Sequence, residues 1–390
     1  ALSRLMGPPF QDRAIRAVAA AWKDVMSTVE SGGGNGKREV STLMVRCASA
    51  TVSFALLSDA AMDSATSSGA SQMLLGMVSD PSDPLLQVSA IDILERMAMT
   101  LPVHSSRAKW LFSHSVLHEL LVLAGGGGHG EEKEAAQPDP ILGGPALRAL
   151  SSLCKLGQRD PSLFAMGGSE LLTGFHRSLH GFEEHMSGEV DRLAFVDAVS
   201  SFAGASPDAA ACVLDDQILR DGWLTVTLAQ PKLKSVVIHS VAMVIDPPAE
   251  KDSSGDTIMD AHKPSDALAM RFFDALGSVN GYDPTELALS AAKSPLVEIR
   301  LGAYELLRAI AKRGTGAQIL LSHEGFYDFL LEREKETTKE GKEAKFEIVK
   351  AVLQSDAKAL LADSIVDAME KHVDQGPHYI KTQPWELATD

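Results

Sequence analysis

The histidines of one segment are the residues whose type and spacing could support metal chemistry. His176 and His180 are four residues apart, so a helix would place both imidazoles on one face, where together they could chelate a metal. His185 follows in the same segment, but no Glu follows His176. A complete site would need Cys154 or a carboxylate from elsewhere in the chain. We therefore interpret the segment as a solvated helix face and expect no metal site.

Other patterns resemble a catalytic pair and a phosphate-binding loop only superficially. Ser113–His114 and Ser322–His323 occupy equivalent places in repeated segments, and a catalytic Ser–His pair is rarely duplicated, so we interpret them as loop and helix-cap residues. The stretch Ser31–Arg38 (SGGGNGKR) lacks the leading Gly and the hydroxyl after Lys37 that a phosphate-binding loop requires, and it follows a predicted helix instead of a strand. We expect no catalytic residues, no cofactor and no enzymatic activity.

The composition indicates a helical protein that binds other proteins. Aromatic residues make up only 5% of the 390 residues, while Ala and Leu dominate, which favours helices over strands. The formal charge of −16 argues against a nucleic-acid partner, because binding to phosphates needs a basic surface. With 3 cysteines and no apolar run of membrane-spanning length, we expect a cytoplasmic or nuclear protein that contacts no membrane.

The stretch Ala146–Gly157 (ALRALSSLCKLG) carries an apolar helical stripe, and the chain repeats it. Similar patterns occur at Ala90–Ala98, Ala194–Gly204 and Ala303–Gly314, and a second shared pattern follows each of them. Equivalent points recur about every 50 residues, with one interval twice as long, a spacing that predicts a stacked helical solenoid. The fold class that we predict is all-α, an armadillo/HEAT-like right-handed superhelical solenoid with one degenerate repeat and two disordered loop insertions.

The predicted organisation is a single solenoid over residues 1–376, followed by an extended tail at 377–390. Within it we expect weak repeats at 1–79, clear repeats at 80–124, 141–174, 190–230 and 294–331, a degenerate repeat at 232–290, and terminal helices at 342–373. The two loop insertions lie at 125–140 and 246–266.

The repeated pattern resembles the third helix of an armadillo repeat, which lines the concave face of such stacks. In phase with Ala146, the third and seventh positions of the pattern should point outward. These positions, together with one neighbouring arginine, give the predicted protein-binding residues Asp92, Arg96, Arg148, Ser152, Asp197, Ser201, Glu305 and Arg308. They mix both signs of charge, which suits a folded protein surface, although each residue could also be merely solvated.

The C-terminal part resembles a known protein family. Segments that match in order and spacing are Arg271–Gly277, Asp283–Leu289, Pro295–Leu331, Glu332–Val352 and Gly376–Lys381. Together they are similar to the family of 26S proteasome non-ATPase regulatory subunit 5, as is the repeat within residues 80–121. The chain departs from the family in the loops at 125–130 and 246–266 and in the residues after Lys381, and we expect it to lack the family's N-terminal repeats.

The resemblance implies a non-enzymatic assembly chaperone of the proteasome regulatory particle. Such a protein would bind the C-terminal domain of one base ATPase subunit, scaffold the associated base subunits, and leave before the mature particle forms. No contact residues carry over from the family, because no short motif defines them. Two alternatives remain: a generic armadillo adaptor that binds another protein or peptide, and an enzyme on a helical scaffold. Peptide-binding grooves usually carry Trp and Asn where this chain has charged residues, which disfavours the adaptor.

Overall fold

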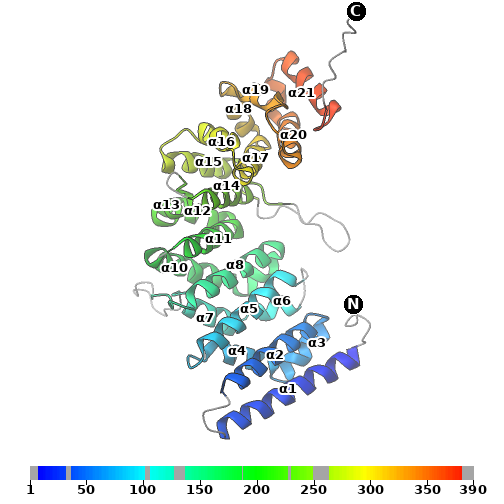
Figure 1. The fold of residues 1–390 in the computed structure, drawn as a ribbon, viewed down its shortest axis with the longest axis vertical. Helices are drawn as coiled ribbons and strands as arrows, with labels where there is room; N and C mark the ends of the chain where they lie inside the picture. Colours follow the sequence, from blue (N-terminus) through cyan, green and yellow to red (C-terminus); the bar gives the residue numbers. More distant parts are fainter. Residues whose placement is uncertain are drawn as a thin grey trace, which may run out of the picture. The chain divides into compact units, whose positions relative to one another are not determined.

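The computed structural model describes residues 8–31, 37–101, 106–126, 137–186, 188–226, 230–248 and 263–379. All regular elements in these ranges are helices (Figure 1). The chain divides into two compact units. Unit 1 contains Ala1–Trp223, and unit 2 contains Leu224–Pro248 and Lys263–Asp390. None of the described helices combines the length and the apolarity that crossing a membrane requires.

Unit 1 is built from short and long helices in a recurring order. The helices are α1 (Pro8–Ser31), α2 (Lys37–Ala55), α3 (Asp59–Ser67), α4 (Ala70–Ser79), α5 (Pro84–Thr100), α6 (Ser106–Leu111), α7 (His114–Leu123), α8 (Gly143–Arg159), α9 (Pro161–Leu163), α10 (Ser169–His185), α11 (Glu189–Ala205), α12 (Pro207–Asp215) and α13 (Gln217–Leu224). The long helices α5, α8 and α11 pack side by side, and α4, α7 and α10 form a second row beside them (Figure 1). This is the repeat arrangement of an α-solenoid.

The apolar stripe of α8 forms the centre of this packing. Leu147, Leu150 and Cys154 are completely buried, and Leu153 is almost so. The small residues Ala146 and Ala149 are also inaccessible, so the flanking helices α5 and α11 can pack closely against α8. The predicted amphipathic pattern is therefore confirmed at this helix.

Unit 2 continues the same order of helices. It contains α14 (Pro231–Ile245), α15 (Asp266–Asn280), α16 (Pro284–Ala292), α17 (Val297–Ala311), α18 (Gly314–Ser322), α19 (Phe326–Leu331), α20 (Lys339–Gln354) and α21 (Asp363–Gln375), with a 3-10 helix at Asp356–Leu360. The long helices α14, α17 and α20 pack in sequence. The stretch 232–290, predicted as degenerate, forms three ordinary helices, α14 to α16.

Several helices begin with a capping residue followed by proline. Asp83, Ser206 and Asp283 each precede a proline and accept a hydrogen bond from a backbone N–H of the first helical turn. Proline suits the first helical position because its fixed φ is already helical and its missing N–H would have no partner there. These short polar–proline pairs thus define where these three helices begin.

The all-helical solenoid predicted from the sequence is confirmed. Most of the predicted loops at 125–140 and 246–266, and the tail after residue 379, lie outside the described residues. The predicted terminal helices at 342–373 correspond to α20, the 3-10 helix and α21.

Candidate protein-interaction surface

Predicted binding residues on the long helices of unit 1 lie next to one another in space. Asp92 on α5, Arg148 on α8 and Asp197 on α11 have side chains that are 51%, 41% and 45% exposed. Two further residues join them, Glu95 on α5 and Lys155 on α8. We call these five side chains, Asp92, Glu95, Arg148, Lys155 and Asp197, the charged ladder.

Within the charged ladder, Arg148 of α8 lies near two acidic side chains of α5. Its Nη2 lies 3.9 Å from Oδ1 of Asp92, and its Nε lies 3.8 Å from Oε2 of Glu95. Both distances exceed a hydrogen bond, so the guanidinium has donors available for a partner. Burial raises the pKa of Glu95 although Arg148 opposes this shift. Arg96, another predicted residue, is exposed on the same helix, and its Nε contacts the carbonyl oxygen of Asp92 at 3.4 Å.

Lys155 and Asp197 of the charged ladder form a direct ion pair between neighbouring repeats. Nζ of Lys155 lies 2.7 Å from Oδ1 of Asp197, and both side chains are about half exposed. One turn further along, the Gln158 amide donates to the carbonyl oxygen of Ser201 at 3.0 Å. The side chains of the charged ladder are thus acidic on α5, basic on α8 and acidic on α11.

The two predicted serines do not point outward. Ser152 is 6% exposed and Ser201 is 3% exposed. The Ser201 hydroxyl donates to the carbonyl oxygen of Asp197, within its own helix. The prediction was wrong at these two serines, because α8 and α11 each pack against several neighbouring helices that cover them, whereas Arg96 at the equivalent position of α5 is exposed.

The remaining predicted residues lie on α17 of unit 2. Glu305 forms a short contact with Nδ1 of His239 on α14. The hydrogen bond from His239 lowers the pKa of Glu305, and the same bond raises the pKa of His239. Arg308, partly buried on the same helix, lies within the electrostatic influence of Glu305. Sequence reasoning missed Glu95, Lys155 and His239. Glu95 and Lys155 each lie three residues after a predicted residue, Asp92 and Ser152, whereas no predicted residue lies on α14 with His239.

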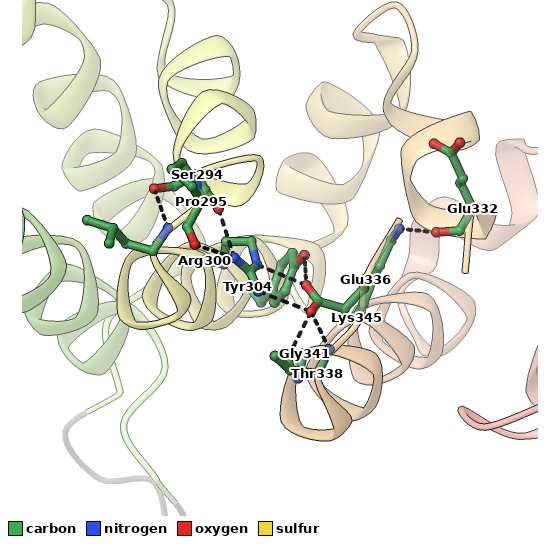
Figure 2. Close-up of polar contacts among 10 residues, drawn as sticks. Ser294, Pro295, Arg300, Tyr304, Glu332, Glu336, Thr338, Gly341 and Lys345 are labelled. Carbon is green, nitrogen blue, oxygen red and sulfur yellow. Dashed lines mark hydrogen bonds and ion pairs between the residues drawn. The ribbon is translucent and has the colours of Figure 1, made fainter. Parts of the chain in front are cut away.

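A different polar network holds α17 to the segment before α20 (Figure 2). We call it the Glu336 cluster, and its members are Arg300, Tyr304, Glu336 and Thr338. Arg300 binds both carboxylate oxygens of Glu336, at 3.1 and 3.2 Å, and the Tyr304 hydroxyl donates to Oε2 at 2.8 Å. The backbone N–H and hydroxyl of Thr338 donate to Oε1 at 3.0 and 2.7 Å.

Burial governs the chemistry of the Glu336 cluster. The Glu336 side chain is only 3% exposed. Burial alone would raise its pKa, but the hydrogen bonds from Arg300 and Thr338 lower that pKa to about 2. Lys345 is also buried and donates to the carbonyl oxygen of Glu332 at 2.5 Å (Figure 2), and burial lowers its pKa to about 8. These buried groups use their hydrogen-bonding atoms on one another, so the cluster stabilises the fold and has few donors or acceptors left for a binding partner.

The sequence suggested that the histidine segment is a solvated helix face, but the structure gives two of these histidines a common partner. Nε2 of His176 and Nε2 of His180 lie 3.2 and 2.5 Å from the same atom, Oδ2 of Asp216. Burial lowers the pKa of His176, as does the neighbouring His180. Burial would raise the pKa of Asp216, yet the hydrogen bonds from the Leu219 N–H and His180 hold it below its usual value. Asp216 also caps α13, since its Oδ1 accepts hydrogen bonds from the backbone N–H groups of Ile218 and Leu219.

The described helices define the class of protein: an α-solenoid whose long helices stack through apolar stripes. Solved structures found as similar include a designed armadillo repeat protein (TM-score 0.45, 12% identity, covering 72% of this chain and 98% of that chain). Another is an engineered protein from a structural genomics consortium (TM-score 0.48, 13% identity, covering 72% of this chain and 94% of that chain).

The C-terminal part is similar to one particular protein family. Residues 256–389 match the family model described as Proteasome non-ATPase 26S subunit. The chain is also 28% identical over 100 residues to 26S proteasome non-ATPase regulatory subunit 5 of Bos taurus and of Homo sapiens. These alignments cover 25% of this chain and 20% of each relative. The resemblance predicted from the sequence is therefore confirmed for the C-terminal part, which contains the Glu336 cluster.

Proposed function

We propose that this protein is a non-enzymatic assembly chaperone of the proteasome regulatory particle. It binds the C-terminal domain of a base ATPase subunit, scaffolds the associated base subunits, and leaves before the mature particle forms. The observation that carries the proposal is the family match over residues 256–389. A cytoplasmic or nuclear location follows from the same proposal.

The solenoid supports this role physically. A row of long helices presents one continuous face that a folded domain can contact at several points. On unit 1 that face carries the charged ladder, in which acidic and basic side chains alternate and all except Glu95 are about half exposed. Such a pattern selects a partner by charge complementarity and disfavours uniformly charged polymers. Steric exclusion by a bound chaperone needs no catalytic residue.

The first test is co-purification of this chain with the isolated C-terminal domain of each proteasomal ATPase at moderate salt. Selective binding to one domain is the expected result. Equal retention of all domains, or of none by a chain that is folded by circular dichroism, would overturn the proposed partner. Binding of an unstructured peptide instead would support the adaptor alternative.

A paired substitution then tests which surface is used. The double variant Arg96→Glu and Arg148→Glu should weaken partner binding at least about tenfold, because each reversal places like charges against the partner's complementary patch. Helical content should not change, since both side chains are exposed or half-exposed. The matched control is Arg271→Glu, on the exposed side of α15 in unit 2. Unchanged binding by the double variant would exclude the charged ladder as the contact surface.

A further inference from the structure

In unit 1, two imidazole nitrogens and one carboxylate oxygen converge at a single point. His176 and His180 project from the same side of α10, and Asp216 lies between α12 and α13. In the described part of the chain, these residues form a group whose possible ligand atoms all lie within 4.8 Å of one another. We propose that His176, His180 and Asp216 bind a divalent transition-metal ion of the zinc class, independently of the proposed chaperone function.

The distances fit a metal with little rearrangement. Bonds of about 2.0–2.1 Å in a tetrahedral site separate neighbouring ligand atoms by about 3.3 Å. The distance from Nε2 of His176 to Oδ2 of Asp216 is already 3.2 Å. The His180 nitrogen, at 2.5 Å from the same oxygen, needs to move outward by less than an ångström, which a small side-chain rotation supplies.

The ligands are oriented by the surrounding structure. Oδ1 of Asp216 accepts the backbone N–H groups of Ile218 and Leu219, at 3.0 and 3.1 Å, so Oδ2 is directed at the histidines. The Phe202 ring lies 5.9 Å from the His176 ring and limits its movement. Fixing of ligands by their outer partners is a common feature of metal sites.

The site is also accessible. The side chains of His176, His180 and Asp216 are 28%, 26% and 16% exposed, so an ion can enter without unfolding of the helices. Two imidazoles with one carboxylate suit zinc and its transition-metal neighbours better than calcium or magnesium, which prefer oxygen ligands alone. Three protein ligands leave one position of a tetrahedral ion to water.

The chain provides a matched control in a second histidine pair. His114 and His118 on α7 have the same spacing, and their rings lie 5.5 Å apart. The carboxylate of Glu170 contacts Nδ1 of His114, and the His114 side chain is 67% exposed. This pair has the helical spacing of a chelate, but among the described residues it is not part of a group of three whose possible ligand atoms all lie within 4.8 Å of one another.

The test is titration of the chelator-treated full chain with zinc chloride, followed by calorimetry. We expect about one equivalent of zinc to bind, with affinity reduced more than about tenfold in His180→Gln and in Asp216→Asn, since even outer partners of a metal contribute at least that much. Asp216→Asn keeps the helix cap, because Asn caps as well as Asp, and circular dichroism confirms folding. His118→Gln should bind zinc like the wild type.

The same titration can overturn the proposal. It fails if the wild type binds no zinc, if His180→Gln and Asp216→Asn bind as tightly as the wild type, or if His118→Gln loses as much affinity as they do. A cobalt titration gives an independent readout, because visible absorption bands of a low-symmetry site should appear in the wild type and be absent in His180→Gln.

Discussion

The charged ladder and the Glu336 cluster both join neighbouring repeats through charged side chains, yet their surroundings differ. In the charged ladder, Asp92, Lys155 and Asp197 are about half exposed, and Arg148 makes only long contacts. In the Glu336 cluster, Glu336 is 3% exposed and five hydrogen bonds reach its carboxylate. Exposed pairs contribute little stability, whereas removing one member of a buried pair is costly. The comparison thus assigns stability to the cluster and leaves the ladder as the surface that we propose for recognition.

The largest effect is expected from Glu336→Ala. This change leaves the Arg300 guanidinium, whose side chain is 14% exposed, without its carboxylate partner. The free energy of unfolding should fall by about 3–5 kcal/mol, as measured by urea denaturation. The control is Glu343→Ala, which removes an exposed carboxylate of α20 and should change stability by less than about 0.5 kcal/mol. Equal losses in the two variants would contradict the division between cluster and ladder.

Acid should remove the stabilising contribution of the Glu336 cluster. The pKa of Glu336 falls from 4.5 to about 2 on folding, so its stabilising contribution is complete above pH 4.5 and disappears as the pH falls toward 2. A shift of this size corresponds to about 3 kcal/mol. Unfolding measured between pH 6 and 2 should therefore show a smaller pH dependence for Glu336→Gln than for the wild type. The same slope in both proteins would refute the assignment.

A close approach of backbone and side chain makes Gly341 a further test of the cluster. A Cβ atom on Gly341 would lie 2.3 Å from Cδ of Glu336. Gly341→Ala should therefore cost about 1–3 kcal/mol through overpacking, despite the higher helix propensity of alanine. The control is Gly144→Ala in the first turn of α8, where a Cβ would meet nothing within 4 Å. The midpoint of thermal unfolding of both variants measures the effect. A higher midpoint for Gly341→Ala than for the wild type would contradict the predicted overpacking.

The sequence predicted the solenoid because apolar spacing along a helix depends only on nearby residues. The stripe of Leu147, Leu150 and Cys154 and the helix start at Asp83 are local patterns of this kind. The charge-rich segment 332–345 gave no such signal. It contains two buried charges, Glu336 and Lys345, and burial of Glu336 depends on Arg300, 36 residues away in the chain.

The candidate sites show the same limit of local patterns. The sequence located the exposed charges Asp92, Arg148 and Asp197 from helical phase, but it placed Ser152 outward because phase alone does not reveal which neighbouring helix covers a position. It also recognised the His176–His180 spacing without its carboxylate. Asp216 lies 40 residues from His176 and reaches it only through the packing of repeats.

The smallest effect is expected in the charged ladder itself. A double-mutant cycle with Lys155→Ala and Asp197→Ala should give a coupling energy of about 0.2–1 kcal/mol, because both side chains are about half exposed. Urea denaturation of the wild type, both single variants and the double variant measures it. Raising the salt concentration should reduce the coupling further, since exposed charges are screened. A coupling of several kcal/mol that persists in salt would instead show that the Lys155–Asp197 ion pair is structural, like the Glu336 cluster. Arg148 and Asp92 would then be the charges of the ladder that remain to select a partner.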